Sequence, residues 1–400
     1  MITRDVKNNE YKKVDELFSI AFNLPLDPPG DNEEDKEPDD WRVASFLDDD
    51  TTMTSCIYIP FFEMNFDGSM CKMAGIGGVS TPPQYRRNGG IRACFDYALP
   101  KMYEKGMDFS YLYPFSTAYY RKFGYENCCD MEVYKIRLEH IPFFKTKGQI
   151  YMIDETNRDK AVNDVKKVYS CWEKRYNCMT APTEDSFEWV TKASPLQGTE
   201  YNFVYKNESG IATGYMRVAT DIGTERNLCC RQFVFEDIDA LKAMLGLLRT
   251  YAADFLHVSI NMPRDTNLEH VLPEWSFGAV SRTLYPFGMI RVINAESVLK
   301  KASYKGSGEF VICLKDEKIA ENNGAFKVTY KEGEDTVVSK LSLEPSENYI
   351  KMDISLFSSL IAGARTLTEA MFMGDIEGDF CVDDFDNVFY RKPMYIMASF

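Results

Sequence analysis

Histidine is nearly absent from this sequence, and no apolar run in it is long enough to cross a membrane. The histidines, His140, His257 and His270, lie far apart and have no cysteine partners at ligand spacing, so we expect no metal. A transmembrane helix needs about 18 to 20 consecutive apolar residues, which none of the apolar segments reaches. The first residues, MITRDVKNNEYKKVDELF, carry charges throughout, so we expect neither export nor contact with a membrane.

A disulfide framework and an excess of positive charge are also missing. The 11 cysteines include two adjacent pairs but no CxxC spacing, which favours reduced thiols and a cytoplasmic location. The formal net charge is -15, and no basic stripe with interleaved aromatics offsets it. Because such a chain repels phosphate backbones, we expect no nucleic acid partner. A cationic substrate suits this charge better.

The sequence does contain enough apolar material for large cores. Hydrophobic residues make up 45% of the 400 residues, and aromatic residues make up 14%. A chain of this length exceeds what one hydrophobic core usually organises, so we expect two or three globular domains.

The first third of the chain alternates helix and strand patterns. The expected elements are a helix over 9–22, strands over 55–62 and 71–81, a helix over 91–105 and a strand over 109–114. Gly77 and Gly78 would weaken their strand unless it is bulged, so a bulge is expected there. Pro100 should kink its helix or end it early, because proline cannot donate the helical hydrogen bond.

Residues 27–40, DPPGDNEEDKEPDD, contain prolines and 8 acidic residues, so they predict a loop. The simpler interpretation is a solvated surface segment. The alternative is that Asp27, Asp31 and Glu34 help to attract a cationic amine. The sequence leaves both open.

Three domains are expected, over 1–140, 141–290 and 291–400. The central segment repeats α/β patterns but has no glycine-rich basic turn, so it should not hold a nucleotide. The last segment has α+β patterns: strands in FVICLKD and FKVTYKE, one apolar helix over 355–372 and a strand-like end over 387–400.

The turn between the predicted strand 71–81 and the helix that follows is rich in glycine and arginine. Free backbone amides at a helix N-terminus attract anions, and glycine lets the backbone approach a pyrophosphate closely. Arginine side chains at the same place add charge-assisted hydrogen bonds. The candidate cofactor-binding residues are Val79, Ser80, Thr81, Arg86, Arg87, Asn88, Gly89, Gly90, Ile91 and Arg92. The alternative is an exposed basic turn that only starts a helix.

A second cluster, YPFSTAYYRKFGY over 113–125, follows the next predicted strand. Most of its aromatic residues should pack in the core. Tyr120 is a candidate general acid, because a phenol has a reference pKa near 10 and is protonated at neutral pH.

The basic turn resembles the acetyl-CoA loop of GNAT acyltransferases, whose pattern is Arg/Gln-x-x-Gly-x-Gly/Ala after a V-x-P segment. Arg86, Gly89 and Ile91 stand at the patterned positions, and Ile91 departs from the small residue usual there. The ending Y-x-x-F-G-Y resembles the stretch that carries the GNAT tyrosine acid. The resemblance implies that Tyr120 protonates the CoA thiolate and that Phe115 and Ser116 contact acetyl-CoA.

Over its whole length the chain resembles the Eis-type (enhanced intracellular survival) acetyltransferases. That resemblance implies an α/β and α+β fold, with two tandem GNAT (acyl-CoA N-acyltransferase) units followed by a sterol-carrier-like domain. It also implies that the terminal carboxylate of Phe400 is the general base, and that the protein is a homo-oligomer, for which the resemblance favours a homohexamer. The apolar end MYIMASF agrees with a buried terminus.

The expected function is acetyl transfer from acetyl-CoA to a primary amine of a cationic small molecule, such as an aminoglycoside, a polyamine or a lysine-like amine. One alternative is a peptide or protein N-acyltransferase, since double-GNAT myristoyl transferases also resemble a chain with a terminal carboxylate base. Another is a lipid-binding regulatory protein with a vestigial GNAT core.

Overall fold

The computed structural model describes residues 1–25, 41–196, 198, 200–221, 226–343, 345–373 and 376–400. The predicted acidic loop 27–40 lies outside the described residues. Backbone contacts divide the chain into two compact units. The first unit contains residues 1–128, 287–392 and 399–400, and the second contains 129–286 and 393–398. The chain thus leaves the first unit after Cys128 and returns to it at Phe287, while the expected boundaries near 140 and 290 stay predictions.

The first unit is built on an eight-stranded sheet whose order is β1-β2-β3-β5-β6-β15-β7. Its strands are β1 (Ile2–Asp5), β2 (Trp41–Phe46), β3 (Met53–Ile59), β5 (Ser69–Ser80), β6 (Phe109–Leu112), β7 (Glu126–Asn127) and β15 (Met289–Val292), with β4 (Phe61–Phe66) paired to β5. β15 lies between β6 and β7 although residues 129–286 of the second unit separate it from them in sequence. The N-terminal sheet is therefore incomplete without residues 289–292.

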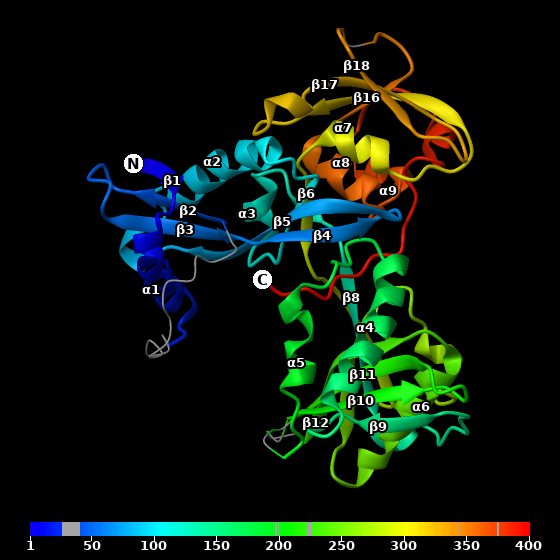
Figure 1. The fold of residues 1–400 in the computed structure, drawn as a ribbon. Helices are drawn as coiled ribbons and strands as arrows, with labels where there is room; N and C mark the ends of the chain where they lie inside the picture. The colour runs from blue at the N-terminus through cyan, green and yellow to red at the C-terminus, as the bar shows by residue number, and fades with distance from the viewer. Residues whose placement is uncertain (26–40, 197, 199, 222–225, 344, 374–375) are drawn as a thin grey trace. The chain divides into compact units, whose positions relative to one another are not determined.

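Two helices cover opposite faces of this sheet (Figure 1). Successive side chains of a strand point to opposite faces, and Val43 packs in the core under α2 (Gly90–Glu104), whereas Ala44 packs in the core under α1 (Tyr11–Phe22). The helix predicted over 9–22 is confirmed. Pro100 lies inside α2, which runs on to Glu104, so of the two effects expected of this proline the early end of the helix does not occur.

β5 and β6 pair in parallel only as far as Ile76 and Leu112. β5 continues to Ser80 against β3, where the register shifts between Cys56 and Tyr58. Gly78 at that shift has a φ of 52°, which glycine adopts without steric cost. The predicted bulge is confirmed, and the two parallel strands separate beyond it.

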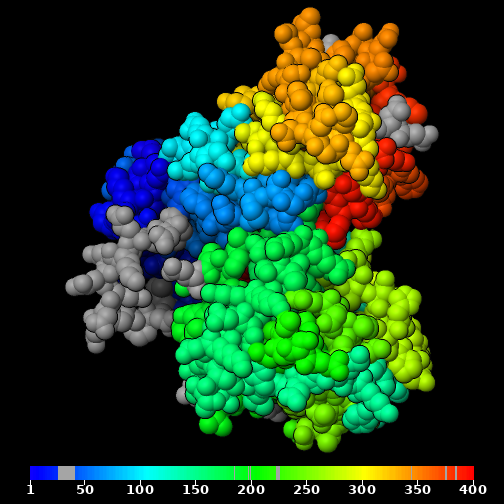
Figure 2. Space-filling view, turned by 45° about the vertical axis from the view of Figure 1, so that its right-hand side comes forward, coloured from blue at the N-terminus to red at the C-terminus, as the bar shows by residue number. Residues whose placement is uncertain are grey.

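The C-terminal part of the first unit is a five-stranded sheet with helices between it and the N-terminal sheet (Figure 1). Its elements are β16 (Gly308–Lys315), β17 (Gly324–Tyr330), β18 (Val337–Leu341), β19 (Tyr349–Asp353), β20 (Glu377–Asp379), α7 (Ala295–Lys301), α8 (Ile354–Ile361) and α9 (Leu367–Met373). α8 contacts β15 and β7 on one side and β19 and β16 on the other. In space-filling view the yellow and orange atoms of this part lie directly against the N-terminal atoms (Figure 2).

Two expectations for this part are wrong. The single helix predicted over 355–372 is broken into α8 and α9, because Gly363 turns the chain with a φ of 88° and its α-carbon packs against Lys392. The strand predicted at the end of the chain is not formed. Residues 387–400 do not pair with another strand in a β-ladder, and Met394 forms an isolated β-bridge with Asn177.

The second unit is a seven-stranded sheet ordered β14-β8-β13-β12-β11-β10-β9. Its elements are β8 (Asp130–Arg137), β9 (Gln149–Met152), α4 (Arg158–Arg175), α5 (Glu188–Thr191), β10 (Glu200–Lys206), β11 (Ala212–Asp221), β12 (Asn227–Phe235), α6 (Ile238–Arg249), β13 (His257–Pro263) and β14 (Val280–Pro286). Apolar side chains of α6 fill the core against β11, β12 and β13. None of the 11 cysteines forms a disulfide in the structure. Within the described residues, no helix combines the length and the hydropathy that a bilayer span requires.

Candidate active site

A cavity of about 650 Å³ opens in the first unit between the end of β5, the start of α2 and the segment around α3 (Thr117–Arg121). Of the sequence-predicted cofactor residues, those that line it are Val79, Thr81, Arg86, Arg87, Gly89, Gly90, Ile91, Arg92 and Phe115. Ser80, Asn88 and Ser116 are not among the residues that line it. The fold therefore brings the basic turn and the aromatic segment to one place.

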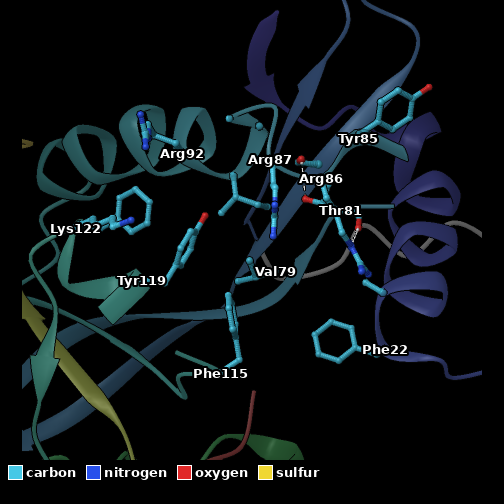
Figure 3. A pocket seen from close by; sticks show the side chains of 16 residues that line it. Phe22, Val79, Thr81, Tyr85, Arg86, Arg87, Arg92, Phe115, Tyr119 and Lys122 are labelled. Atoms are coloured by element: carbon cyan, nitrogen blue, oxygen red, sulfur yellow. Dashed lines mark hydrogen bonds between the residues drawn. The ribbon is translucent and has the colours of Figure 1, made fainter. Parts of the chain in front are cut away.

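The cavity is cationic. Its lining includes Arg86, Arg87, Arg92 and Lys122, and no carboxylate side chain occurs among the described residues that line it. Figure 3 shows Arg87 projecting into the cavity between Tyr119 and Arg86, with Arg92 and Lys122 on the side nearer Tyr119. Several phosphate charges can be neutralised in such a site by charge-assisted hydrogen bonds.

The backbone of the turn adds further donors. The first internal hydrogen bond of α2 runs from the amide of Ala93 to the carbonyl of Gly89, so the amides of Gly90, Ile91 and Arg92 precede the helical ladder. Arg87 and Gly89 both have left-handed backbone conformations, with φ of 66° and 85°. Left-handed backbone conformations at alternate residues turn successive N–H groups toward one concave site, and the helix N-terminus adds partial positive charge. The turn therefore has the features of a pyrophosphate site.

Gly90 is required by close packing. A Cβ at this position would lie 2.3 Å from the Ser55 hydroxyl oxygen, which is itself 2.9 Å from the hydroxyl of Thr81. Glycine therefore lets α2 start directly against β3. Ile91, the departure from the GNAT pattern, lines the cavity and packs against the core under α2, so its larger side chain is accommodated.

Tyr119 and Tyr120 differ in their exposure to the cavity. Tyr119 lines it, whereas Tyr120 is only 2% exposed and its ring packs against Phe95, Phe115 and Tyr119. Burial raises the pKa of Tyr120 well above its usual value, and the neighbouring Tyr119 and Tyr125 act in the same direction. Burial also raises the pKa of Tyr119. Both phenols are therefore protonated at neutral pH.

Within the first unit, Phe400 packs against Gly75 and Gly77 of β5, a few residues before the cavity-lining Val79. A Cβ built on Gly77 would lie 2.9 Å from the carboxyl carbon of Phe400, and a Cβ on Gly75 would lie 2.8 Å from its ring. The ring also contacts Phe62 and Tyr113, each with a centroid distance of 5.2 Å. The terminal carboxylate is therefore held over the strand that leads into the basic turn.

Several residues that line the cavity were not among the predicted site residues. They are Ala21, Phe22, Ser55, Tyr85, Tyr119, Lys122 and Phe123. Phe22 is 47% exposed at the end of α1 and stacks on Phe18 with a centroid distance of 4.5 Å, and no sequence pattern indicates that it lies at the cavity. Lys122 lies within the aromatic segment 113–125, but nothing in its sequence neighbourhood separates it from an ordinary surface lysine.

Comparisons with protein families identify two domains. Residues 3–128 match the profile of the acetyltransferase (GNAT) domain, and residues 295–397 match that of the sterol carrier protein domain. A search of curated protein sequences gave no match. The GNAT domain makes the chain an acyltransferase and implies acetyl-CoA as its co-substrate, which the cationic cavity suits.

Solved structures share the fold over the full chain. A probable N-acyltransferase from Enterococcus faecalis is 21% identical with a TM-score of 0.85, covering 100% of this chain and 99% of its own. A GCN5-related N-acetyltransferase from Anabaena variabilis is 16% identical with a TM-score of 0.84, and Eis1 from Mycobacterium abscessus is 17% identical with a TM-score of 0.80; both cover 100% of each chain. The predicted fold class, tandem GNAT units with a sterol-carrier-like domain, is confirmed. The chain therefore carries a GNAT acetyltransferase domain and a sterol carrier protein domain, and its fold is similar to that of Eis1 throughout.

Proposed function

We propose that the protein transfers the acetyl group of acetyl-CoA to a primary amine of a cationic small molecule, of the aminoglycoside, polyamine or lysine-like kind. The observation that supports this most directly is the position of the Phe400 carboxylate against Gly77, beside the cavity-lining turn. A carboxylate at that point is an acceptor for the proton that an ammonium group must lose before its nitrogen attacks a thioester. The formal net charge of -15 favours the approach of cations.

The rest of the reaction uses residues of the same unit. Arg86, Arg87 and the amides at the start of α2 bind the pyrophosphate of acetyl-CoA, while Arg92 and Lys122 lie further along the cavity for its other phosphate. The amine attacks the carbonyl directly, and the backbone amide near Val79, next to the bulge, stabilises the oxyanion. A donor in that role contributes about 3 kcal/mol. Tyr120 gives its proton to the departing thiolate.

Two further points belong to this proposal. The enzyme works in the cytoplasm on a small-molecule amine, without nucleic acid, membrane or metal. It does so as a homo-oligomer, for which the family resemblance favours a hexamer.

The test is a substrate screen. Diamines, polyamines, aminoglycosides and lysine peptides are incubated with acetyl-CoA, and both free thiol and acetylated amine are measured. We expect matched amounts of the two products with at least one small cationic amine, and at least tenfold less of both with the Arg87→Ala variant at the same subsaturating acetyl-CoA concentration. The N-acyltransferase alternative would instead be supported if the enzyme transfers a long acyl chain from acyl-CoA to peptide N-termini and acetylates none of the small amines.

A further inference from the structure

The short helix α3, which carries Tyr120, is held by an ion pair at its C-terminal end. α3 has 5 residues, and no side chain caps its N-terminus. A helix of this length is not stable in water on its own, so its position depends on tertiary contacts. Arg121, the residue after Tyr120, donates from Nε and Nη2 to the two carboxylate oxygens of Glu126, each at 2.8 Å. This bidentate pair fastens the end of the helix to β7.

Glu126 is in turn held from the C-terminal part of the first unit. Its side chain is only 8% exposed, and Nη2 of Arg365, in the connection between α8 and α9, donates to Oε1 at 3.0 Å. The amide of Asn127 donates to the same oxygen at 2.9 Å. Burial alone would raise the pKa of Glu126, but the hydrogen bonds from Arg121 and Asn127 outweigh it and lower the pKa. The side chain is therefore a carboxylate that joins α3 to the C-terminal part.

The turn that follows α3 packs directly against the same C-terminal part. Gly124 has a φ of 80°, and a Cβ on it would lie 1.7 Å from Nη1 of Arg291 and 2.8 Å from Cγ2 of Ile354, the first residue of α8. Arg291 is fully buried, and its Nη2 donates to both carboxylate oxygens of Asp316 at 2.7 Å. The glycine of the F-G-Y signature therefore lets the turn rest on a buried ion pair whose carboxylate comes from the C-terminal part.

These contacts lie outside the acetyl-CoA cavity. Neither Glu126 nor Arg365 is among the described residues that line it. The Tyr120 ring, in contrast, packs on Phe115, which does line the cavity. A proton donor must come within hydrogen-bond reach of its acceptor, so a displacement of about 1 Å can lower the rate about 100-fold. Residues that hold α3 can therefore govern a proton transfer in the cavity without contact with it.

We propose that Glu126 and Arg365 are positioning residues for Tyr120, and that the C-terminal part of the first unit takes part in acetyl transfer by holding α3. The inference rests on the proposed function, in which Tyr120 gives its proton to the departing CoA thiolate. Arg365 lies within residues 295–397, which match the sterol carrier protein domain. That domain thereby has a role in the transferase reaction that requires no lipid ligand.

The test uses steady-state kinetics of the full-length protein with its best amine at saturating acetyl-CoA. Arg365→Met removes the guanidinium, and we expect kcat to fall about tenfold while the Kd for CoA stays unaltered. Arg365→Lys keeps a cation beside Glu126 and should restore most of kcat. Glu126→Gln weakens the same contact from the other side and should lower kcat as well. The matched control is Lys327→Met, which breaks an ion pair with Glu309 elsewhere in the C-terminal part and should leave kcat unaltered. Thermal melts verify folding.

The decisive comparison repeats Arg365→Met in the Tyr120→Phe protein. If Arg365 acts through the phenol, Arg365→Met lowers kcat in the wild type and has no further effect in Tyr120→Phe, because residues that act together are non-additive. An equal loss in both backgrounds marks a merely structural role and overturns the inference. So does wild-type kcat in Arg365→Met when Tyr120→Phe is slow, and in both cases the proposed acid stands. Wild-type kcat in Tyr120→Phe itself removes the acid from the proposed function, and the inference falls with it.

Discussion

The carboxyl carbon of Phe400 lies 2.9 Å from the position that a Cβ on Gly77 would occupy. The methyl group added by Gly77→Ala therefore displaces the Phe400 carboxylate. The alanine cannot move away instead, because the Tyr58 ring lies 3.1 Å from the same point. We expect kcat to fall about 100-fold, as for a displacement of about 1 Å at a reacting group. CoA affinity should stay close to that of the wild type. The measurement is steady-state kinetics with the best amine, beside a CoA titration.

The matched control for this glycine is Gly246→Ala. Gly246 lies in α6 of the second unit, and its added Cβ would meet nothing closer than 3.9 Å. Alanine is the better helix former, so this variant should be equally active and up to about 1 kcal/mol more stable. Wild-type turnover in Gly77→Ala would mean that the carboxylate position does not matter for catalysis.

Arg87→Ala should weaken CoA binding. Arg87 projects into the cationic cavity, and a hydrogen bond to a charged group contributes about 1.5–3 kcal/mol, equal to about 10- to 150-fold in Kd. Arg231→Ala, which removes an exposed arginine of the second unit, is the control for net charge. Calorimetry with CoA gives both values. Unchanged affinity in Arg87→Ala would exclude the turn as the pyrophosphate site.

Tyr120→Phe should lower kcat about 100-fold or more while CoA affinity is kept, as for loss of a general acid. Tyr119→Phe removes the hydroxyl that lines the cavity and should be much less affected. If Tyr119→Phe lowers kcat strongly and Tyr120→Phe does not, the general acid is Tyr119.

The expected pH dependence of kcat follows from the direction in which the pKa of Tyr120 is shifted. Burial raises the pKa of Tyr120, and its protonated form is the acid, so a raised pKa extends the active range upward. We expect no loss of kcat from this group between pH 8 and about 9.5, since its reference pKa is already near 10. An alkaline limb in that range that disappears in Tyr120→Phe would contradict the shift.

Glu10 is expected to support the N-terminal part of the sheet in a pH-dependent way. Its carboxylate accepts hydrogen bonds from Arg4 at 2.8 and 2.9 Å, and this guanidinium lowers the pKa of Glu10 from 4.5 to about 2. A lowered folded-state pKa stabilises the fold above the unfolded-state value and loses that effect as pH falls from 4.5 toward 2. Glu10→Gln should therefore cost about 1–3 kcal/mol at pH 7 and nearly nothing near pH 2, by urea unfolding.

The sequence was sufficient to predict local features and insufficient for distant ones. The bulge at Gly78 and the arginine turn follow from residue types at fixed spacing, so the cationic turn that lines the cavity was predictable. The insertion of β15 between β6 and β7 was not, because no local pattern shows which strands a distant segment joins. Phe22 and Lys122 reach the cavity through tertiary packing alone. The chain end resembled a strand by its apolar residues, but its contacts are with single glycines and rings instead of a ladder.

The assignment of the Phe400 carboxylate as general base predicts unusual sensitivity to chain length. One residue added after Phe400 moves the charge by about 3.5 Å, beyond hydrogen-bond reach of an amine or water at the original place. Deletion of Phe400 moves it in the other direction and removes the ring that packs on Gly75, Phe62 and Tyr113. Both variants should melt near the wild-type temperature and bind CoA, because the arginine turn does not depend on the terminus. Amine turnover alone should fall, and most steeply below pH 8, where the substrate arrives as ammonium. If the extended enzyme acetylates amines at the native rate from pH 6 to 9, the proton leaves through another acceptor and the terminus only packs.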